Sequence, residues 1–320
     1  MKKKILVTGG TGFIGSNIVN KLLSLGHEVV VIDNNQRGRT TRLLKHKNLK
    51  FIQGDIRSYN DLFLASKKIN TIIHCAYVNG TKTFYKKPDL ILDIAVTGIQ
   101  NILNLVKNKK IKEFYLISSS EVYQLPEKIP TPEEVPLTIP DILNPRFSYG
   151  GGKIISEMIS IHAIKKFVKK LIIVRPHNVY GPDMGQGHVI PEIIQKIIKA
   201  SNNFKKKIIK LEIQGSGNET RAFTYIDDFV DGLMILMNIK TKFAIYHIGN
   251  DEETKVIKVV KKILSILKLE AIIKKKTLLI GSVLRRCPNI YKMKKIGFRN
   301  KISLTSGLKL CINWHLKNLN

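Results

Sequence analysis

The sequence has no long apolar segment, and it is poor in cysteine and in acidic residues. Its 320 residues include 43% apolar side chains, enough to bury a full core, so the composition is typical of a globular protein. No apolar run approaches the roughly 20 residues that span a bilayer. After Lys2–Lys4 only Ile5–Val7 are apolar before Thr8, which indicates a strand rather than a secretion signal. We therefore expect no membrane partner.

Cysteine occurs three times, as Cys75, Cys287 and Cys311. The three are widely separated and lack the spacing of metal ligands, so the sequence predicts no metal site. Free thiols are typical of a reducing compartment, and the expected location is the cytoplasm.

Acidic residues number 24 against 54 basic ones, a net charge of +30. Such an excess favours either a nucleic-acid partner or a compositional bias with solvated cations. The cations are spread along the whole chain and are mostly Lys, whereas recognition of phosphate and bases favours Arg. We therefore expect no nucleic-acid partner, and a surface that attracts anionic substrates.

Short β-branched runs alternate with longer amphipathic segments through the first two thirds of the chain. Parallel strands need crossover helices, so this alternation predicts the α/β class with a doubly wound parallel sheet of the Rossmann type. The predicted strands are Ile5–Thr8, Glu28–Ile32, Lys50–Gln53, Thr71–His74, Glu113–Ile117 and Leu171–Val174.

From about Pro176 the alternation loosens, and turn-forming stretches separate helices from short strands. We predict that residues 1–175 form mainly the dinucleotide-binding domain. Residues 176–320 then form mainly a smaller carboxyl-terminal substrate lobe, with some segments returning to the sheet. Open α/β sheets bind ligands at the carboxyl ends of their strands, which is where the lobe is expected.

A glycine-rich segment, Thr8–Gly15, follows the first predicted strand and precedes a helical pattern. Gly9, Gly12 and Gly15 are spaced as in loops that let a backbone approach a pyrophosphate, with Phe13 and Ile14 at the helix amino terminus, which carries partial positive charge. The alternative interpretation is an ordinary glycine-rich turn. The place of this segment between a strand and a helix favours a dinucleotide site.

The second strand is followed by Asp33, where the adenosine ribose hydroxyls are expected. A carboxylate there repels a 2′-phosphate and so predicts NAD, although Arg37 and Arg39 lie close enough to leave NADP as an alternative. Taken alone, Asp33 is also compatible with a strand-end turn. Asp55, after the third strand, is a candidate for the adenine edge, but Asp is common at strand ends.

Tyr149 and Lys153 are four residues apart at the start of a helical pattern, on one face. A tyrosine with a pKa near 10 is a poor base, and a neighbouring ammonium favours its phenolate. Tyr291 and Lys295 have the same spacing. The pair Tyr149/Lys153 follows a strand ending in Ser118–Ser120, whose hydroxyls are candidates to bind a sugar oxygen. The second pair lacks such neighbours, and we interpret Tyr291 as a packing residue.

Together these residues resemble the extended short-chain dehydrogenase/reductase family, in its nucleotide-sugar epimerase, dehydratase and decarboxylase group. The resemblance covers nearly the whole chain. Thr8–Gly15 is similar to the amino-terminal signature, and Ser119, Tyr149 and Lys153 to the catalytic triad. Further matching segments are 175–182, 220–228 and 285–290.

The resemblance implies roles for a larger set of residues. Asn178, Arg221 and Arg286 are expected to hold the nucleotide diphosphate, in line with the fit of arginine forks to phosphate oxygens. Ser119, Ser120 and Glu121 are expected beside the sugar. The implied cofactor-binding residues are Gly9, Gly12, Phe13, Ile14, Gly15, Asp33, Asn34, Asp55, Ile56, Cys75, Ala76, Tyr149 and Lys153.

The shared reaction of this group begins with hydride transfer from sugar carbon 4 to NAD while the tyrosine removes the hydroxyl proton. The following step depends on the residues after the catalytic serine. Dehydratases usually have Asp-Glu there, so Ser120 and Glu121 disfavour dehydration. They are compatible with an epimerase, our first expectation, and with a decarboxylase acting on UDP-glucuronate. Glu121 is equally compatible with a structural role.

Three residues depart from the group's pattern. Tyr77 replaces a small residue after the fourth strand and is expected to crowd or stack against the cofactor. Ala95 replaces a common asparagine, and Gln124 a common glycine.

An alternative of another class is a non-catalytic NAD-binding or nucleic-acid-associated protein, since fold alone does not determine function. A homodimer through the helices around the Tyr/Lys segment is a further expectation from the resemblance.

Overall fold

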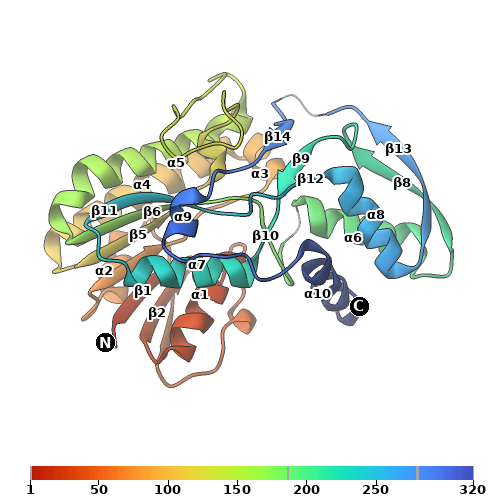
Figure 1. Cartoon of the computed structure of the whole chain (residues 1–320). Coiled ribbons are helices and arrows are strands. Elements are labelled where there is room, and N and C mark those ends of the chain that lie inside the picture. Colours follow the sequence, from red (N-terminus) through yellow and green to blue (C-terminus); the bar gives the residue numbers. More distant parts are fainter. Residues whose placement is uncertain (1, 186, 279–280, 320) are drawn as a thin grey trace. The chain divides into compact units, whose positions relative to one another are not determined.

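The computed structural model describes residues 2–185, 187–278 and 281–319, and the chain divides into two units (Figure 1). Unit 1 consists of Met1–Gln124, Pro136–Pro176 and Val230–His247. Unit 2 consists of Leu125–Val135, His177–Phe229 and Ile248–Asn320.

Unit 1 is built on a seven-stranded sheet in the order β11-β6-β5-β4-β1-β2-β3. The pairs from β3 across to β6 are all parallel. This arrangement confirms the doubly wound class predicted from the sequence. The strands are β1 (Lys4–Thr8), β2 (Glu28–Asp33), β3 (Leu49–Gln53), β4 (Thr71–His74), β5 (Glu113–Ile117), β6 (Lys170–Pro176) and β11 (Phe243–Ile248).

Helices cover both faces of this sheet (Figure 1). On one face α4 packs along α5 and against α2, and on the other Lys21 of α1 forms an ion pair of 2.9 Å with Asp231 of α7. The inner strands are buried on both sides, which explains their nearly continuous β-branched runs. The helices are α1 (Phe13–Ser24), α2 (Tyr59–Ala65), α3 (Thr81–Lys86), α4 (Pro88–Asn108), α5 (Ser148–Ile159) and α7 (Ile226–Asn238), whose first residues belong to unit 2.

Among the described residues, α4 is the one helix long and apolar enough to cross a membrane by length and composition. Half of its most apolar stretch is buried within the protein. Its buried residues, such as Ile99 and Ile102, belong to the core of unit 1. A core helix meets the same criterion, so this observation is weak support for a membrane segment.

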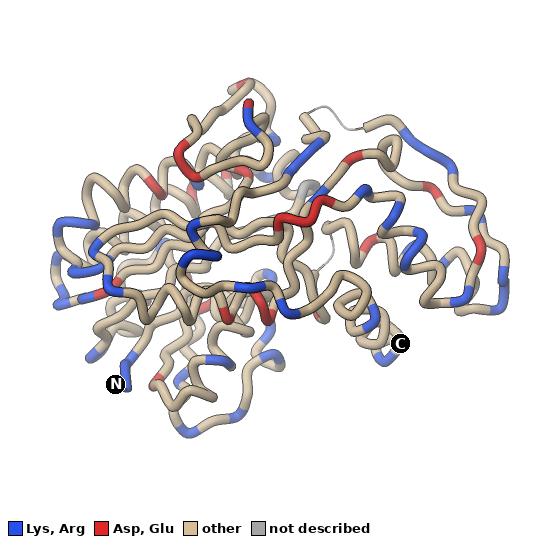
Figure 2. The backbone as a smooth tube through the Cα atoms, viewed as in Figure 1, with Lys and Arg blue, Asp and Glu red and all other residues tan. Residues whose placement is uncertain are grey.

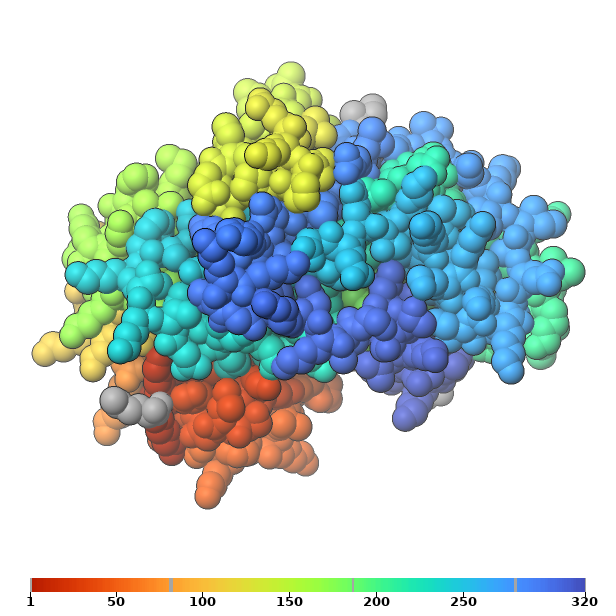
Figure 3. All heavy atoms as spheres, in the orientation of Figure 1, coloured from red at the N-terminus to blue at the C-terminus, as the bar shows by residue number. Residues whose placement is uncertain are grey.

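In the part of unit 2 that the structure describes, three small sheets combine with four helices that belong to this unit alone. The sheets are β12-β9-β14, β13-β8 and β10-β7. Although β8 and β13 are far apart in the sequence, they pair in parallel along their full length (Figures 1 and 3). The strands are β7 (Val179–Tyr180), β8 (Ile208–Gln214), β9 (Thr220–Ala222), β10 (Thr224–Tyr225), β12 (Glu253–Lys255), β13 (Glu270–Lys276) and β14 (Arg285–Arg286). The helices are α6 (Val189–Ala200), α8 (Val256–Leu267), α9 (Tyr291–Lys295) and α10 (Leu304–Lys317).

The basic residues are spread over the elements of both units (Figure 2). Many lie at helix ends and on exposed strands, for example Lys274–Lys276 at the end of β13. The charge therefore follows the general surface, as expected for a compositional bias.

Candidate active site

The glycine loop closes tightly between β1 and α1. Gly9 has φ +70°, and a Cβ there would lie 2.6 Å from the Cα of Ala76; a Cβ on Gly15 would lie 2.1 Å from the carbonyl oxygen of Gly9. Only glycine permits these backbone approaches. α1 begins at Phe13 with Gly12 as its N-cap, so the first N–H groups of the helix have no acceptor within it. Such a terminus suits an anionic phosphate.

Asp33 lies beside this loop and its carboxylate is held in place. One oxygen accepts a hydrogen bond from the backbone N–H of Thr11 (3.0 Å), and the other accepts one from that of Asn35 (2.8 Å). Each oxygen keeps a lone pair for a further donor. The position and the remaining acceptors fit the predicted ribose hydroxyls.

The side chains predicted to bind near the adenine already have partners within the protein. The carboxylate of Asp55 forms a bidentate ion pair with Arg57 (2.8 Å), accepts from the side chain of Asn34 (2.9 Å), and has a pKa lowered to about 2, chiefly by Arg57. Its lone pairs are therefore occupied in this structure. The side chain of Ile56 is buried against Gly98, and its backbone carbonyl accepts from the side-chain amide of Asn101 (3.0 Å). The cofactor roles of these residues stay predictions.

The end of β4 and the segment after it are hydrogen-bonded to Thr8 of β1. The hydroxyl of Thr8 accepts from the backbone N–H of Ala76 (3.2 Å) and shares a hydrogen bond with Nδ1 of His74 (2.8 Å). Burial, with the charge of Lys153, lowers the pKa of His74 to about 3, so the imidazole is neutral. Burial also raises the pKa of the Cys75 thiol to about 12. Cys75 and Ala76 thus line the glycine loop without charge.

Tyr149 and Lys153 lie one turn apart at the start of α5 and are 5% and 3% exposed. The ring of Tyr149 stacks on Phe84 of α3, with centroids 4.9 Å apart. The ammonium of Lys153 donates to the carbonyl of Ile117 at the end of β5 (2.8 Å). Burial lowers the pKa of Lys153 to about 8, so it is mostly protonated at neutral pH. Phe84 has no distinctive sequence signal and was missed.

The serines after β5 have different environments. Ser119 is half-buried, and its hydroxyl accepts from the backbone N–H of Glu121 (3.1 Å). Ser120 is buried. Ser118 is not available to a sugar, because its hydroxyl is buried and donates to Glu157 of α5 (2.5 Å). The hypothesis of three sugar-binding hydroxyls is wrong for Ser118, which points to the opposite face of the strand end.

Glu157 belongs to a buried network that fixes the base of the site. It pairs with Arg175 of β6 (2.6 Å), and Arg175 also donates to the hydroxyl of Tyr123. That hydroxyl bonds His247 of β11 (2.5 Å). The network ties α5 to three strand ends, so it supports the position of the helix that carries Tyr149. Sequence reasoning missed Glu157, whose only signal is its place one turn after Lys153.

Glu121 lies in a short 3₁₀ turn after Ser119, the predicted catalytic serine. Its carboxylate lies 3.9 Å from the guanidinium of Arg146, with exposed fractions of 21% and 11% for the two side chains. A carboxylate so placed is held by a cation yet still accessible. Both a structural and a chemical role for Glu121 fit this geometry.

All three departures from the group's pattern lie against glycines of α5. Gln124, at φ +47°, lies where a Cβ on Gly150 would be, since its amide nitrogen is 2.2 Å from that position. Tyr77 packs against Tyr149 and Lys153. The expected crowding by Tyr77 is therefore directed at the catalytic pair itself.

In unit 2 the predicted diphosphate residues converge. Arg221 of β9 and Arg286 of β14 are partners in register, and the amide of Asn178 donates to the carbonyl of Ala222 (3.3 Å). Arg286 is buried, whereas the guanidinium of Arg221 donates to the carbonyls of Thr220 and Val283 (2.7 Å each). The fork of Arg221 is thus bound to backbone oxygens here. Its phosphate role stays a prediction.

Tyr291 and Lys295 are the first and last residues of α9. Unlike Tyr149, Tyr291 is not buried. Tyr291 is 60% exposed, and the ammonium of Lys295 lies 4.6 Å from its ring centroid. The interpretation of Tyr291 as a packing residue is wrong, because α9 is a short surface helix. Among the described residues no group of three His, Cys, Asp or Glu side chains is arranged to hold a metal ion.

The arrangement of a glycine cradle, a carboxylate and a buried Tyr/Lys pair agrees with comparison to known proteins. The sequence profile described as "NAD dependent epimerase/dehydratase family" matches residues 5–249. The chain belongs to this family. The resemblance inferred from the motifs is thereby confirmed, and with it an enzyme family whose cofactor is NAD.

Individual relatives carry the names of different activities, among them decarboxylases, epimerases and a dehydratase. The chain is 30% identical to "UDP-glucuronic acid decarboxylase 1" of Xenopus tropicalis over 99% of this chain and 73% of that protein. It is also 30% identical to the "Putative UDP-glucose 4-epimerase" of Methanocaldococcus jannaschii over 99% of both chains. The solved structure of MoeE5 "in complex with UDP-glucuronic acid and NAD" has a TM-score of 0.83 and 25% identity, covering 98% of this chain and 99% of that one.

Within this family, the cradle fits the cofactor on structural grounds. The close backbone approaches at Gly9 and Gly15 keep side chains out of the loop, and Asp33 offers acceptors beside it. Residues Gly9–Gly15, Asp33, Tyr149 and Lys153 are the ones that would hold NAD. The bound dinucleotide supplies a hydride acceptor.

Proposed function

We propose that this member of the family is an NAD-dependent nucleotide-sugar epimerase that acts through a transient 4-keto intermediate. The observation that carries the proposal is the buried pair of Tyr149 and Lys153 on α5, with Ser119 at the end of β5 and the glycine loop at the end of the same sheet. Parallel strands place their carboxyl ends along one edge, so these groups share the ligand-binding edge of unit 1.

Each residue has a defined task in this proposal. Tyr149 takes the proton from the hydroxyl on sugar carbon 4 as the hydride leaves that carbon, and returns it when the ketone is reduced from the other face. Lys153 favours the phenolate through its positive charge and orients the nicotinamide ribose. Ser119 donates a hydrogen bond to the same sugar oxygen. Asn178, Arg221 and Arg286 are proposed to hold the diphosphate in unit 2.

A second candidate is the decarboxylation of UDP-glucuronate, supported by Ser120-Glu121 after the catalytic serine and by relatives with that name. The first step is the same oxidation at carbon 4. The resulting β-keto acid then loses carbon dioxide, the enolate takes up a proton, and return of the hydride and of the Tyr149 proton to the carbon 4 ketone would give the UDP-pentose and restore the oxidised cofactor. Glu121 beside Arg146 is the candidate group for that proton.

The two candidates are separated by offering the purified chain UDP-glucose, UDP-galactose and UDP-glucuronate with NAD and identifying the sugar products by mass spectrometry and NMR. An epimer from a neutral hexose supports the first. Carbon dioxide and a UDP-pentose from UDP-glucuronate support the second. Absence of any product from these and from the corresponding GDP- and dTDP-sugars would contradict both. A salt-sensitive shift of nucleic acid would then favour the non-catalytic alternative.

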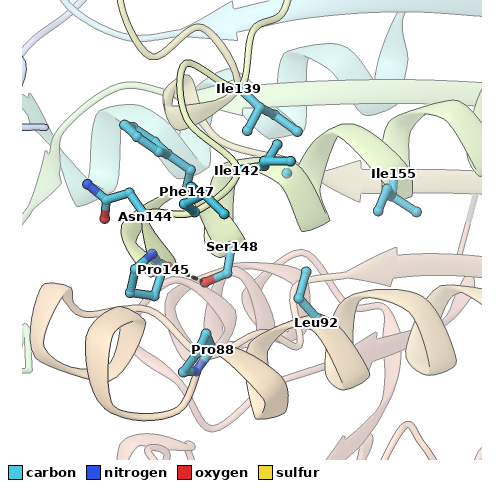
Figure 4. A pocket seen from close by; sticks show the side chains of 11 residues that line it. Pro88, Leu92, Ile139, Ile142, Asn144, Pro145, Phe147, Ser148 and Ile155 are labelled. Carbon is cyan, nitrogen blue, oxygen red and sulfur yellow. Dashed lines mark hydrogen bonds between the residues drawn. The ribbon is translucent and has the colours of Figure 1, made fainter.

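We also propose a homodimer in which α4 and α5 of two copies pack together. An apolar pocket of about 340 Å³ lies between the start of α4, the segment 139–148 and α5, entirely within unit 1 (Figure 4). Ile142 and Leu143, which help to line it, are 85% and 88% exposed. Large exposed apolar side chains around a pocket are typical of a protein contact. Sedimentation of the wild type against Ile142→Glu tests it, and a monomeric wild type contradicts it.

The proposed location is a reducing compartment such as the cytoplasm. The three cysteines are free, and Cys287 and Cys311 are buried. Fractionation of the producing cells tests this, and recovery with the exported proteins would contradict it.

A further inference from the structure

Tyr77 occupies a space that two unusually small residues leave open. A Cβ on Gly152 would lie 2.2 Å from the hydroxyl oxygen of Tyr77 and 2.7 Å from the Cβ of Ala95. Any larger residue at position 152 therefore collides with the phenol. The phenol of Tyr77, Gly152 of α5 and Ala95 of α4 form one complementary set.

The ring of Tyr77 contacts both members of the catalytic pair. The ammonium nitrogen of Lys153 lies 4.0 Å from the Tyr77 ring centroid, compared with 6.0 Å from that of Tyr149. The rings of Tyr77 and Tyr149 stand at 87° with centroids 5.0 Å apart. A cation over an aromatic face and an edge-on ring pair are both attractive geometries.

We propose that Tyr77 is a positioning residue of the active site: its aromatic face holds the ammonium group of Lys153, and its ring fixes the orientation of the Tyr149 phenol. The inference rests on the proposed function only in taking Tyr149 and Lys153 as the catalytic pair. An ammonium has three N–H donors. One is bound to the carbonyl of Ile117 and one faces the Tyr77 ring, which leaves the third for the ribose of the cofactor.

The other groups around Lys153 make this aromatic face important. His74 and Cys75, from β4 and the segment after it, are neutral because burial lowers the pKa of the first to about 3 and raises that of the second to about 12. Glu157 of α5 is already paired with Arg175. Among the described residues no carboxylate forms an ion pair with Lys153. The charge of Glu157 still favours the protonated amine, and the Tyr77 ring and the Ile117 carbonyl are the groups that contact it directly.

The hydroxyl of Tyr77 is not needed for this role. It is buried and has no hydrogen-bond partner among the described residues. Burial, with Tyr149 beside it, raises the pKa of Tyr77 well above its ordinary value, so it stays a neutral phenol. The aromatic ring is the part that acts, and phenylalanine should replace it.

The test compares Tyr77→Phe with Tyr77→Leu in the full-length chain, free and loaded with NAD. Two readouts need no substrate: the dissociation constant for NAD, and the pH dependence of phenolate absorbance, taken as the difference from the same protein carrying Tyr149→Phe. We expect Tyr77→Phe to match the wild type in both. Tyr77→Leu fills similar space without a π face, so NAD affinity should fall roughly two- to thirtyfold, the range of cation–π energies. The ionisation of Tyr149 should move to higher pH.

Ring fluorination gives a second test that does not depend on the leucine variant folding. Tyr77→Phe carrying one, two and then three ring fluorines keeps the shape while weakening the attraction of the face for a cation. NAD affinity should fall stepwise along the series. Equal affinities along the series, or a Tyr77→Leu protein that behaves as Tyr77→Phe, would overturn the inference. If these variants behave as expected but no nucleotide sugar is turned over, the proposed function fails and the positioning role stands.

Discussion

Two glycine-rich segments of unit 1 use the same residue type in different ways. In the loop after β1, Gly9 and Gly15 allow backbone to approach backbone, with the carbonyl of Gly9 only 2.1 Å from a Cβ on Gly15. In α5, Gly150 and Gly152 leave space that side chains of this same chain fill, namely Gln124 and Tyr77. The difference teaches that a glycine motif marks a ligand site only where the space it creates stays free of side chains.

The largest expected effect separates the two segments by function. Tyr149→Phe keeps the contacts of the ring with Phe84 and Tyr77 but removes the group that accepts the proton. We expect turnover to fall by roughly 10²- to 10⁴-fold, as for loss of a general base, while NAD affinity stays close to the wild type. Steady-state kinetics and equilibrium dialysis measure the two. Near-normal turnover would remove Tyr149 as the base.

The next effect concerns the buried charge beside the α5 glycines. Because burial lowers the pKa of Lys153 from 10.5 to about 8, the unfolded chain binds one more proton than the folded chain between these pH values. The unfolding free energy should therefore rise with pH across that interval, by about 3 kcal/mol at 1.36 kcal/mol per unit. Below pH 8 the cost of burying the charge is fully present.

Denaturant unfolding of the cofactor-free protein at several pH values measures this, with Lys153→Met as the reference. The difference in unfolding free energy between the wild type and Lys153→Met should change between about pH 8 and pH 10.5. A difference that stays constant would show that Lys153 is not buried as a cation.

The third prediction concerns the loop. In Gly15→Ala the new methyl meets the backbone of Gly9 and Gly10, which cannot move without opening the loop. We expect a loss of roughly 2–3 kcal/mol in stability, typical of overpacking, together with weaker NAD binding. Thermal unfolding with and without NAD reports both. A protein that binds NAD as tightly as the wild type would contradict the proposed cradle.

The smallest expected effects compare two neighbouring glycines of α5. Gly152→Ala should destabilise by about 1–3 kcal/mol because its methyl meets Tyr77 and Ala95, and a second change, Tyr77→Ala, should relieve the overlap. Gly151→Ala is the matched control. Its methyl would approach only the flexible end of Ile139, at 3.3 Å, so a gain of about 0.5–1 kcal/mol in helix propensity is expected. Urea unfolding of the wild type, Gly152→Ala, Tyr77→Ala and the double variant measures the coupling, with Gly151→Ala unfolded beside them. Equal effects at positions 151 and 152 would contradict it.

Much of unit 1 was predictable because its signals are local. The strands Thr71–His74 and Glu113–Ile117 begin and end where the sequence pattern placed them, since both are short runs of buried β-branched, aromatic or aliphatic residues. The glycine loop was recognisable because strand, loop and helix adjoin in the chain. β11 was not identified as a strand, because Phe243–Ile248 lies at the sheet edge after a helix and is only partly buried.

The environment of the catalytic pair was less predictable, for a physical reason. Tyr77 and Ala95 each depart from an expected residue, and their fit with Gly152 exists only after β4, α4 and α5 have packed together. The same holds for Arg221, whose fork is occupied by carbonyls of a distant segment, Val283 and Leu284. Pairwise contacts between distant segments carry no signal in a single sequence.

The most direct test of the account follows the hydrogen on sugar carbon 4. The NAD-loaded protein is given UDP-glucose and UDP-glucuronate deuterated at that carbon, and the products are examined by NMR and mass spectrometry. The account predicts that deuterium is found again at carbon 4 of the product, that turnover is slower than with the ordinary sugar, and that Tyr149→Phe abolishes the conversion. Product that forms at an unchanged rate, or that has exchanged its deuterium for solvent hydrogen, would contradict hydride transfer through the bound cofactor.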